Sequence, residues 1–177
     1  QAAAKALAAR FGIPRVVASL SELASASPQA AYILTPPASH PSLALEALDM
    51  GCHVLVEKPM ADSVADCEAM IAKAREKHRL LAVNHSDLFD PVLMQALEFA
   101  RSGRIGELVS VDIVRNSEYP AYAGGPLPSM VTQGSYAFRD LGVHGLYTIE
   151  AFLGNISGAR VDDQSRGGDP NLHFDEC

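Results

Sequence analysis

The sequence predicts an α/β protein in which a parallel sheet comes first and a second domain with a mostly antiparallel sheet follows. Two patterns support this prediction. In the first half of the chain, short apolar runs alternate with helical segments across short connections, and such alternation implies parallel strands with right-handed crossovers. After residue 85, a helix leads into a long extended segment, 107–119, whose apolar residues alternate. That alternation is typical of an antiparallel sheet with one open face.

The elements of the first half are bounded by residues that begin or end helices. Gly12 and Gly51 each follow a helical segment, and glycine is favoured just past the end of a helix. Ser63 is the expected N-cap of another helix, whose buried face is predicted to carry Val64, Cys67, Ile71 and Ala74. The expected helices are 2–11, 21–26, 40–50 and one that begins at Ser63, and the expected strands are 15–18, 31–34, 53–56 and 80–83.

The second half is expected to form a separate domain, so the predicted division is 1–85 and 86–177. Helices are predicted over 91–101 and 136–153. The segment between residues 120 and 134 is rich in proline and glycine, which predicts an exposed loop of the kind that often carries specificity.

Composition excludes several classes of function. The 177 residues are 48% hydrophobic and carry a net charge of −7, which suits a soluble protein of one or two domains. The acidic balance and the lack of a basic stripe argue against nucleic-acid binding, and no apolar run is long enough to cross a membrane. The three cysteines lack metal-site spacing, so we expect no metal, reduced thiols and a cytoplasmic location.

One apolar run, Val54–Val56, ends abruptly at Glu57, Lys58 and Pro59. The proline restricts Lys58 to an extended conformation, and ligands of open α/β sheets bind beyond the carboxyl ends of the strands. A lysine held at that edge is well placed for chemistry. Taken alone, the tripeptide favours an ordinary solvated charge pair, because short motifs give many false positives.

A second candidate group lies on the predicted helix 136–153. Asp140 and His144 are one turn apart, with Tyr147 beside them, and a carboxylate next to an imidazole favours the imidazolium and orients the ring. Gly142 and Gly145 flank the pair and predict a close approach, since each weakens a helix by about 1 kcal/mol. Alone, the pair fits a functional site and a solvated face equally well. The expected core stripe on the opposite side comprises Phe138, Leu141, Gly145, Ile149 and Phe152.

Together these motifs resemble the Gfo/Idh/MocA family of NAD(P)-dependent oxidoreductases, in the family's order and at about its spacing. The resemblance covers nearly the whole chain and is weaker after Gly154. The matching stretches are Thr35-Pro36-Pro37-x-x-His40, Glu57-Lys58-Pro59, Gly103-Arg104-Ile105-Gly106-Glu107 and Asp140-Leu141-Gly142-Val143-His144.

The resemblance implies a Rossmann domain followed by an α/β domain with a large antiparallel sheet. It implies that Lys58, Asp140 and His144 are catalytic and that the Lys58–Pro59 peptide is cis. Because each of the three lies at a strand end or on the polar side of a helix, we expect them to meet in one cleft between the two domains. The implied wall beside the nicotinamide of NAD or NADP comprises Thr35, Pro36, Pro37, His40, Glu57, Lys58, Pro59 and Asn84. The candidate substrate contacts are Lys58, Asp140 and His144 and, more weakly, Tyr122, Tyr136 and Arg139.

The sequence departs from the family pattern in two places. The glycine-rich turn that holds the pyrophosphate is not in these 177 residues, so we expect the chain by itself to bind dinucleotide weakly and to be inactive. Where members often carry an aromatic-Arg-Phe sequence, this chain has Asp87-Leu88-Phe89. The arginine usual at this place is therefore missing, and substrate charge and type are open.

The expected activity is hydride transfer between a nicotinamide cofactor and a secondary alcohol of a sugar, polyol or related polyhydroxylated compound. Two alternatives stay open: an NAD-dependent glycosidase of the same fold, and a non-catalytic dinucleotide-binding regulator. Members of the resembled family often pair sheet to sheet, so we expect a homodimer or homotetramer through the second domain.

Overall fold

The computed structural model describes residues 2–115 and 138–160. The chain divides into two compact units, Gln1–Asn84 and His85–Cys177, which are described separately below. In the described part, no helix is long and apolar enough to cross a membrane.

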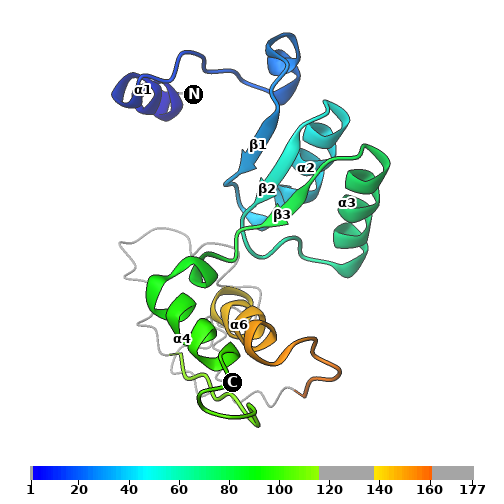
Figure 1. Cartoon of the computed structure of the whole chain (residues 1–177). Coiled ribbons are helices and arrows are strands. Elements are labelled where there is room, and N and C mark those ends of the chain that lie inside the picture. Colours follow the sequence, from blue (N-terminus) through cyan, green and yellow to red (C-terminus); the bar gives the residue numbers. More distant parts are fainter. Residues whose placement is uncertain (1, 116–137, 161–177) are drawn as a thin grey trace, which may run out of the picture. The chain divides into compact units, whose positions relative to one another are not determined.

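Unit 1 is organised around a parallel sheet in the order β1-β2-β3, which confirms the predicted α/β architecture of the first half (Figure 1). The strands are β1 (Ala30–Ile33), β2 (His53–Val56) and β3 (Leu81–Val83). Their register places Ile33 beside Val56 and Val56 beside Val83, so the three strands end at the same edge of the sheet.

The helices of unit 1 begin and end at the residues that the sequence indicates. Gly12 and Gly51 have positive φ angles of 65° and 84°, a conformation that glycine adopts without steric penalty. Ser63 caps its helix by accepting a hydrogen bond from the Asp66 backbone N–H at 3.1 Å. The helices are α1 (Ala2–Phe11), the 3₁₀ turns η1 (Leu20–Ala26) and η2 (Pro37–Ser39), α2 (His40–Asp49) and α3 (Val64–Glu76).

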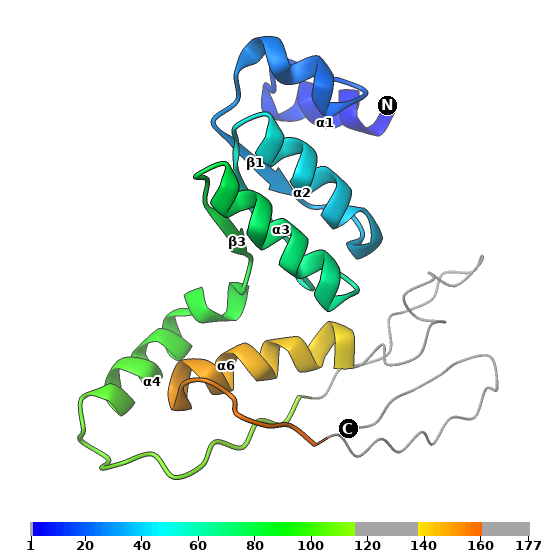
Figure 2. The ribbon, with the colours of Figure 1, turned by 90° about the vertical axis from the view of Figure 1, so that its right-hand side faces the viewer.

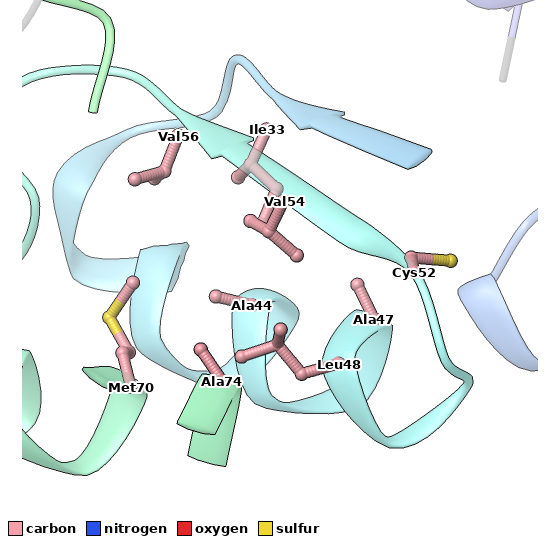
Figure 3. Close-up of a cluster of buried hydrophobic side chains, with 9 residues drawn as sticks. All are labelled: Ile33, Ala44, Ala47, Leu48, Cys52, Val54, Val56, Met70 and Ala74. Carbon is pink, nitrogen blue, oxygen red and sulfur yellow. The ribbon is translucent and has the colours of Figure 1, made fainter. Parts of the chain in front are cut away.

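Helices α2 and α3 cover the same face of the sheet (Figure 2), and the core of unit 1 lies between them and the strands. Figure 3 shows strand side chains directed toward those of the two helices. Each strand-to-strand connection therefore brings one apolar helical face over the sheet, as a parallel arrangement requires. The core cluster comprises Ile33, Ala44, Ala47, Leu48, Cys52, Val54, Val56, Met70 and Ala74.

Two predictions about unit 1 are wrong in detail. On α3, the prediction is confirmed for Ala74, which is buried, and wrong for Val64 and Ile71, which are exposed. Met70 is buried instead, because contact with α2 and the sheet selects a side that only partly overlaps the predicted one. Residues 15–18 are not a strand. The Ala18 N–H donates to a Glu22 carboxylate oxygen at 3.2 Å, so a local contact takes the place of a ladder partner.

In the described part of unit 2, α4 (Pro91–Arg101) lies beside α6 (Val143–Leu153). Before α4 comes the 3₁₀ turn η3 (Ser86–Phe89), and before α6 comes a π-helical turn, η4 (Phe138–Gly142). Asp90 caps α4, since its Oδ1 accepts hydrogen bonds from the backbone N–H groups of Val92 and Leu93. The prediction of a helix over 91–101 is confirmed.

The described part of unit 2 contains no antiparallel sheet. Residues 107–115, the larger part of the predicted strand 107–119, form no strand. Alternation can show only that a segment suits a pleated, half-buried surface, and a strand forms only where a partner ladder is present. The predicted loop 120–134 lies outside the described residues.

The buried side of α6 also differs from the prediction. Tyr147 and Thr148 are its buried residues, whereas Phe138, Leu141, Gly145, Ile149 and Phe152 are only partly buried. The helix contacts η3 and α4. Tyr147 can be buried because its hydroxyl has polar partners in the interior of unit 2. A prediction based only on the apolar residues of α6 therefore selects the wrong side of the helix.

The core of unit 1 predicts a contrast between two identical substitutions. Leu48 is 0% exposed and Leu80 is 72% exposed. We expect Leu48→Ala to lower the free energy of unfolding by about 2–5 kcal/mol and Leu80→Ala to change it by about 0.5 kcal/mol or less. Chemical denaturation of the full-length protein measures both. Equal losses in the two variants would contradict this assignment of the core.

Candidate active site

Polar side chains gather at the edge of unit 1 where the parallel strands end. The Glu57 N–H donates to the Ile33 carbonyl at 3.0 Å, and the Asn84 N–H donates to the Val56 carbonyl at 2.8 Å. These hydrogen bonds continue the pairing one residue past the strands, so Glu57 and Asn84 are held at the same edge. This is the edge at which open α/β sheets bind their ligands.

The Glu57 carboxylate joins all three strands. Asn84 Nδ2 donates to Glu57 Oε1 at 2.7 Å and to the Tyr32 hydroxyl oxygen at 2.8 Å. The Lys58 backbone N–H donates to Glu57 Oε2 at 3.2 Å. The hydrogen bond from Asn84 is the main cause that holds the pKa of Glu57 below its ordinary value, because it stabilises the charged form. A fixed negative charge therefore lies directly before Lys58.

The loops beyond β1 and β2 are connected through a buried histidine. His40 is 0% exposed. Its Nε2 lies 2.6 Å from the Thr35 carbonyl oxygen, and its Nδ1 lies 3.0 Å from the Pro59 carbonyl oxygen. The Lys58–Pro59 peptide is cis, as the resemblance implies. His40 thus supports from behind the segments that the sequence assigns to a cofactor wall, since its own ring is inside the protein.

In unit 2, His144 belongs to a compact polar group. Its Nδ1 lies 3.2 Å from Asp87 Oδ1 and also contacts the Tyr147 hydroxyl. The other Asp87 oxygen contacts the Arg115 guanidinium. Tyr147 is 4% exposed, accepts a hydrogen bond from the Asp87 N–H at 3.3 Å and stacks on the His85 ring with centroids 4.2 Å apart. The imidazole is therefore held by neighbours from two segments.

Burial lowers the pKa of His85 below the ordinary histidine value, although the Glu150 carboxylate opposes the shift. Desolvation disfavours the charged imidazolium. His85 is consequently a neutral aromatic surface against Tyr147 at neutral pH.

The sequence missed the contact between Asp87 and His144. It indicated Asp140 as the carboxylate beside His144, because the two are one helical turn apart. The structure brings Asp87 to Nδ1 of the ring from η3. No local spacing predicts a pair so distant in the chain. The one available signal was that Asp87 belongs to the Asp87-Leu88-Phe89 stretch, which departs from the aromatic-Arg-Phe sequence that the resembled family often carries.

One of the two glycines near His144 lies at a close approach. A Cβ added to Gly142 would lie 2.7 Å from the Phe138 ring, whereas Gly145 has open space around it. Gly142 thus lets the π-helical turn of η4 close on an aromatic ring, and π turns occur frequently at functional sites. The expectation of a close approach is confirmed at Gly142, and it stays a prediction at Gly145.

The remaining candidate residues are distributed as follows. Asp140 and Arg139 lie in η4, and Tyr122 and Tyr136 lie outside the described residues. Lys58 belongs to unit 1 and His144 to unit 2, so their convergence on one cleft stays a prediction. Within the described ranges, no group of three or more histidine, cysteine, aspartate or glutamate residues could hold a metal ion.

Comparison with known proteins agrees with the architecture of unit 1. Residues 1–85 match the family model described as the oxidoreductase family with an NAD-binding Rossmann fold. The chain belongs to the Gfo/Idh/MocA family. Unit 1 is therefore part of an NAD(P)-binding Rossmann domain, which confirms the predicted cofactor class.

Three relatives illustrate the range of the family. A 1-carboxy-3-chloro-3,4-dihydroxycyclohexa-1,5-diene dehydrogenase of Comamonas testosteroni is 46% identical over 77 residues, 44% of this chain and 19% of that protein. A dTDP-3,4-didehydro-2,6-dideoxy-alpha-D-glucose 3-reductase of Actinomadura kijaniata is 30% identical over 85% of this chain and 45% of that protein. The structure of GenD2 from gentamicin A biosynthesis, in complex with NAD, is 25% identical, with a TM-score of 0.65, over 85% of this chain and 43% of GenD2. The chain thus spans less than half the length of each.

The strand-end group of unit 1 predicts a pH-dependent effect on stability. Glu57→Gln should lower the free energy of unfolding by about 1 kcal/mol at neutral pH, because the charged acceptor of the Asn84 and Lys58 hydrogen bonds is lost. Since the folded-state pKa of Glu57 is lowered, its contribution is present above the ordinary glutamate pKa and disappears as the pH falls through the folded-state value.

Denaturation of the wild type and the variant across the acidic range measures this difference, which should narrow as the pH falls. The matched control is Glu68→Gln on the exposed surface of α3, which removes the same charge. A Glu57→Gln effect that is equal to the control at every pH would contradict the role given to Glu57.

Proposed function

We propose that the full-length protein transfers a hydride between NAD or NADP and a secondary alcohol, or the matching ketone, of a sugar, polyol or related polyhydroxylated compound. The observation that carries the proposal is the environment of His144. Its imidazole is largely buried and held at Nδ1 by a carboxylate and a hydroxyl, as a residue that exchanges a proton with a substrate hydroxyl requires. The family of the chain and its Rossmann unit support the redox assignment.

Each side chain has a distinct part in this proposal. His144 takes the hydroxyl proton in the oxidative direction, because an imidazole exchanges protons near neutral pH. Lys58, at the carboxyl edge of the sheet, orients the hydroxyl and stabilises the developing alkoxide charge. Asp140 binds a neighbouring hydroxyl or orients His144. The bound nicotinamide supplies the hydride acceptor.

The residues present fit the nicotinamide end of a dinucleotide. Segments that His40 supports from behind and the carboxylate–amide pair of Glu57 and Asn84 form a polar edge at the ends of parallel strands. In the proposal, the residues that would line the nicotinamide and its ribose are Thr35, Pro36, Pro37, Glu57, Lys58, Pro59 and Asn84.

The names of two relatives support the substrate class. The Actinomadura kijaniata relative is named as a reductase of a nucleotide-linked deoxysugar, and the relative from Comamonas testosteroni as a dehydrogenase of a dihydroxylated ring. Both names describe oxidoreductases of ring compounds with hydroxyl or keto groups.

We also propose that the full-length protein is a homodimer or homotetramer that associates through the second domain, with the exposed apolar side chains of residues 107–115 in the interface. Val109 is 93% exposed, and Val114 is also exposed; large exposed apolar areas are uncommon on monomers. Sedimentation tests this: a monomer at micromolar concentration, or a Val109→Asp variant that associates as the wild type does, would contradict it.

The test of the activity is nicotinamide turnover by the full-length protein with a panel of ketosugars, aldoses and polyols. His144→Gln and Lys58→Met should each lower kcat by about 10²–10⁴-fold, because a proton-transfer partner or an alkoxide-stabilising charge is lost. The matched controls are His78→Gln at an exposed site and Lys73→Met, whose lysine pairs with Asp49 at 3.3 Å. The kcat of each control variant should stay within about twofold of the wild-type value, because these surface residues lie far from the chemistry.

Three outcomes would overturn the proposal. Hydrolysis of a glycoside without net cofactor turnover would identify an NAD-dependent glycosidase, and dinucleotide binding without turnover of any substrate would identify a regulator. Full activity in His144→Gln would remove the proton-transfer role.

A further inference from the structure

The Asp87 carboxylate forms a bridge within unit 2. One oxygen, Oδ1, lies 3.2 Å from Nδ1 of His144, and the other contacts the Arg115 guanidinium. The Asp87 and His144 side chains are 26% and 12% exposed. A carboxylate held on one oxygen by a guanidinium presents the other in a restricted direction, because the charge-assisted hydrogen bond resists rotation of the group. Here that direction is toward the imidazole.

This contact determines which ring nitrogen of His144 carries the proton. An ionised carboxylate only accepts hydrogen bonds, so a contact with Nδ1 is favourable only when Nδ1 is protonated. A second neighbour of Nδ1, the Tyr147 hydroxyl, can donate or accept and therefore imposes no choice. It already accepts the Asp87 backbone N–H, which ties Tyr147 to the same turn. The neutral ring then has its lone pair on Nε2.

We propose that Asp87 is a positioning residue that fixes His144 in the Nδ1–H tautomer, so that Nε2 is the atom that takes the substrate proton. The inference rests on the proposed function for the role of His144, but the tautomer itself can be measured without turnover. It also gives a physical meaning to the departure of Asp87-Leu88-Phe89 from the family pattern. At this place the chain has a carboxylate, and Arg115 from another segment supplies the cation that contacts it.

The tautomer is read directly from the ¹⁵N shifts of His144 in the full-length protein, with histidine-selective labelling and His144→Gln for assignment. At a pH where the ring is neutral, wild-type Nδ1 should show the shift of a protonated nitrogen and Nε2 that of an unprotonated one. In Asp87→Asn, the amide can donate as well as accept, so the preference for Nδ1–H should fall by about tenfold, which corresponds to about 1.4 kcal/mol.

Three further variants separate Asp87 from its surroundings. Asp90→Asn makes the same chemical change three residues away at the cap of α4 and should leave the His144 shifts unchanged. Asp87→Glu keeps a carboxylate and should retain more of the Nδ1–H tautomer than Asp87→Asn. Tyr147→Phe removes the adaptable hydroxyl but keeps the ring, and should preserve the tautomer. A wild-type ring protonated on Nε2, or a tautomer that changes in Tyr147→Phe and not in Asp87→Asn, would overturn the inference.

Turnover distinguishes this inference from the proposed function. If both hold, Asp87→Asn should lower kcat by about 10²–10⁴-fold, as loss of the correct tautomer does, while KM changes little and Asp87→Glu recovers part of the rate. If the shifts respond to Asp87 but His144→Gln keeps full activity, the proposed function fails and the tautomer assignment stands. Equal ¹⁵N shifts in the wild type and in folded Asp87→Asn would refute the positioning role whatever the activity.

Discussion

Unit 1 depends on the burial of one face of a short parallel sheet beneath two helices. The Val54 and Val56 side chains pack between the strands and α2 and α3 (Figure 3). Parallel strands require crossovers, and the crossover helices here supply the apolar cover. Once the strands are in register, their carboxyl ends coincide, and the residues that follow them must share one edge. The site of unit 1 is thus a consequence of core packing.

Two polar contacts make that edge a defined surface. His40 holds the loops after β1 and β2 through carbonyl oxygens on either side of its ring. The Glu57 carboxylate is held by Asn84 and by the Lys58 N–H. Both groups use backbone atoms that would otherwise lack partners in a loop, which restricts the backbone on both sides of Lys58. Restricted loops at a strand edge can present a side chain in one direction without a rigid secondary structure beneath it.

Unit 2 achieves a similar restriction with side chains. Tyr147 lies inside, stacked on His85, and its hydroxyl contacts both His144 and the Asp87 backbone. Gly142 lets the π-helical turn before α6 close on Phe138. The imidazole of His144 is therefore positioned by a network of connected side chains. The stabilisation from such a network can exceed the sum of its pairwise contacts.

The sequence by itself determined the α/β order of unit 1, the bounds of β2 and α4, and the position of Lys58 at the end of a strand. These features depend on local physics: the period of apolar residues, the restriction that Pro59 places on Lys58, and the glycines past the helix ends. The cis peptide and the NAD(P)-binding fold followed from the resemblance carried by the same motifs.

Only the tertiary structure decided which sides of α3 and α6 are buried, that residues 15–18 and 107–115 form no strand, and that Asp87 contacts Nδ1 of His144. A helix that is apolar on several sides has no unique inner face until a neighbour selects one, and an extended segment becomes a strand only beside a partner. Contacts between residues far apart in the chain depend on how its segments pack, and no local spacing encodes them. For that reason the sequence could indicate Asp140, one helical turn from His144, but not the contact that Asp87 makes with the same ring.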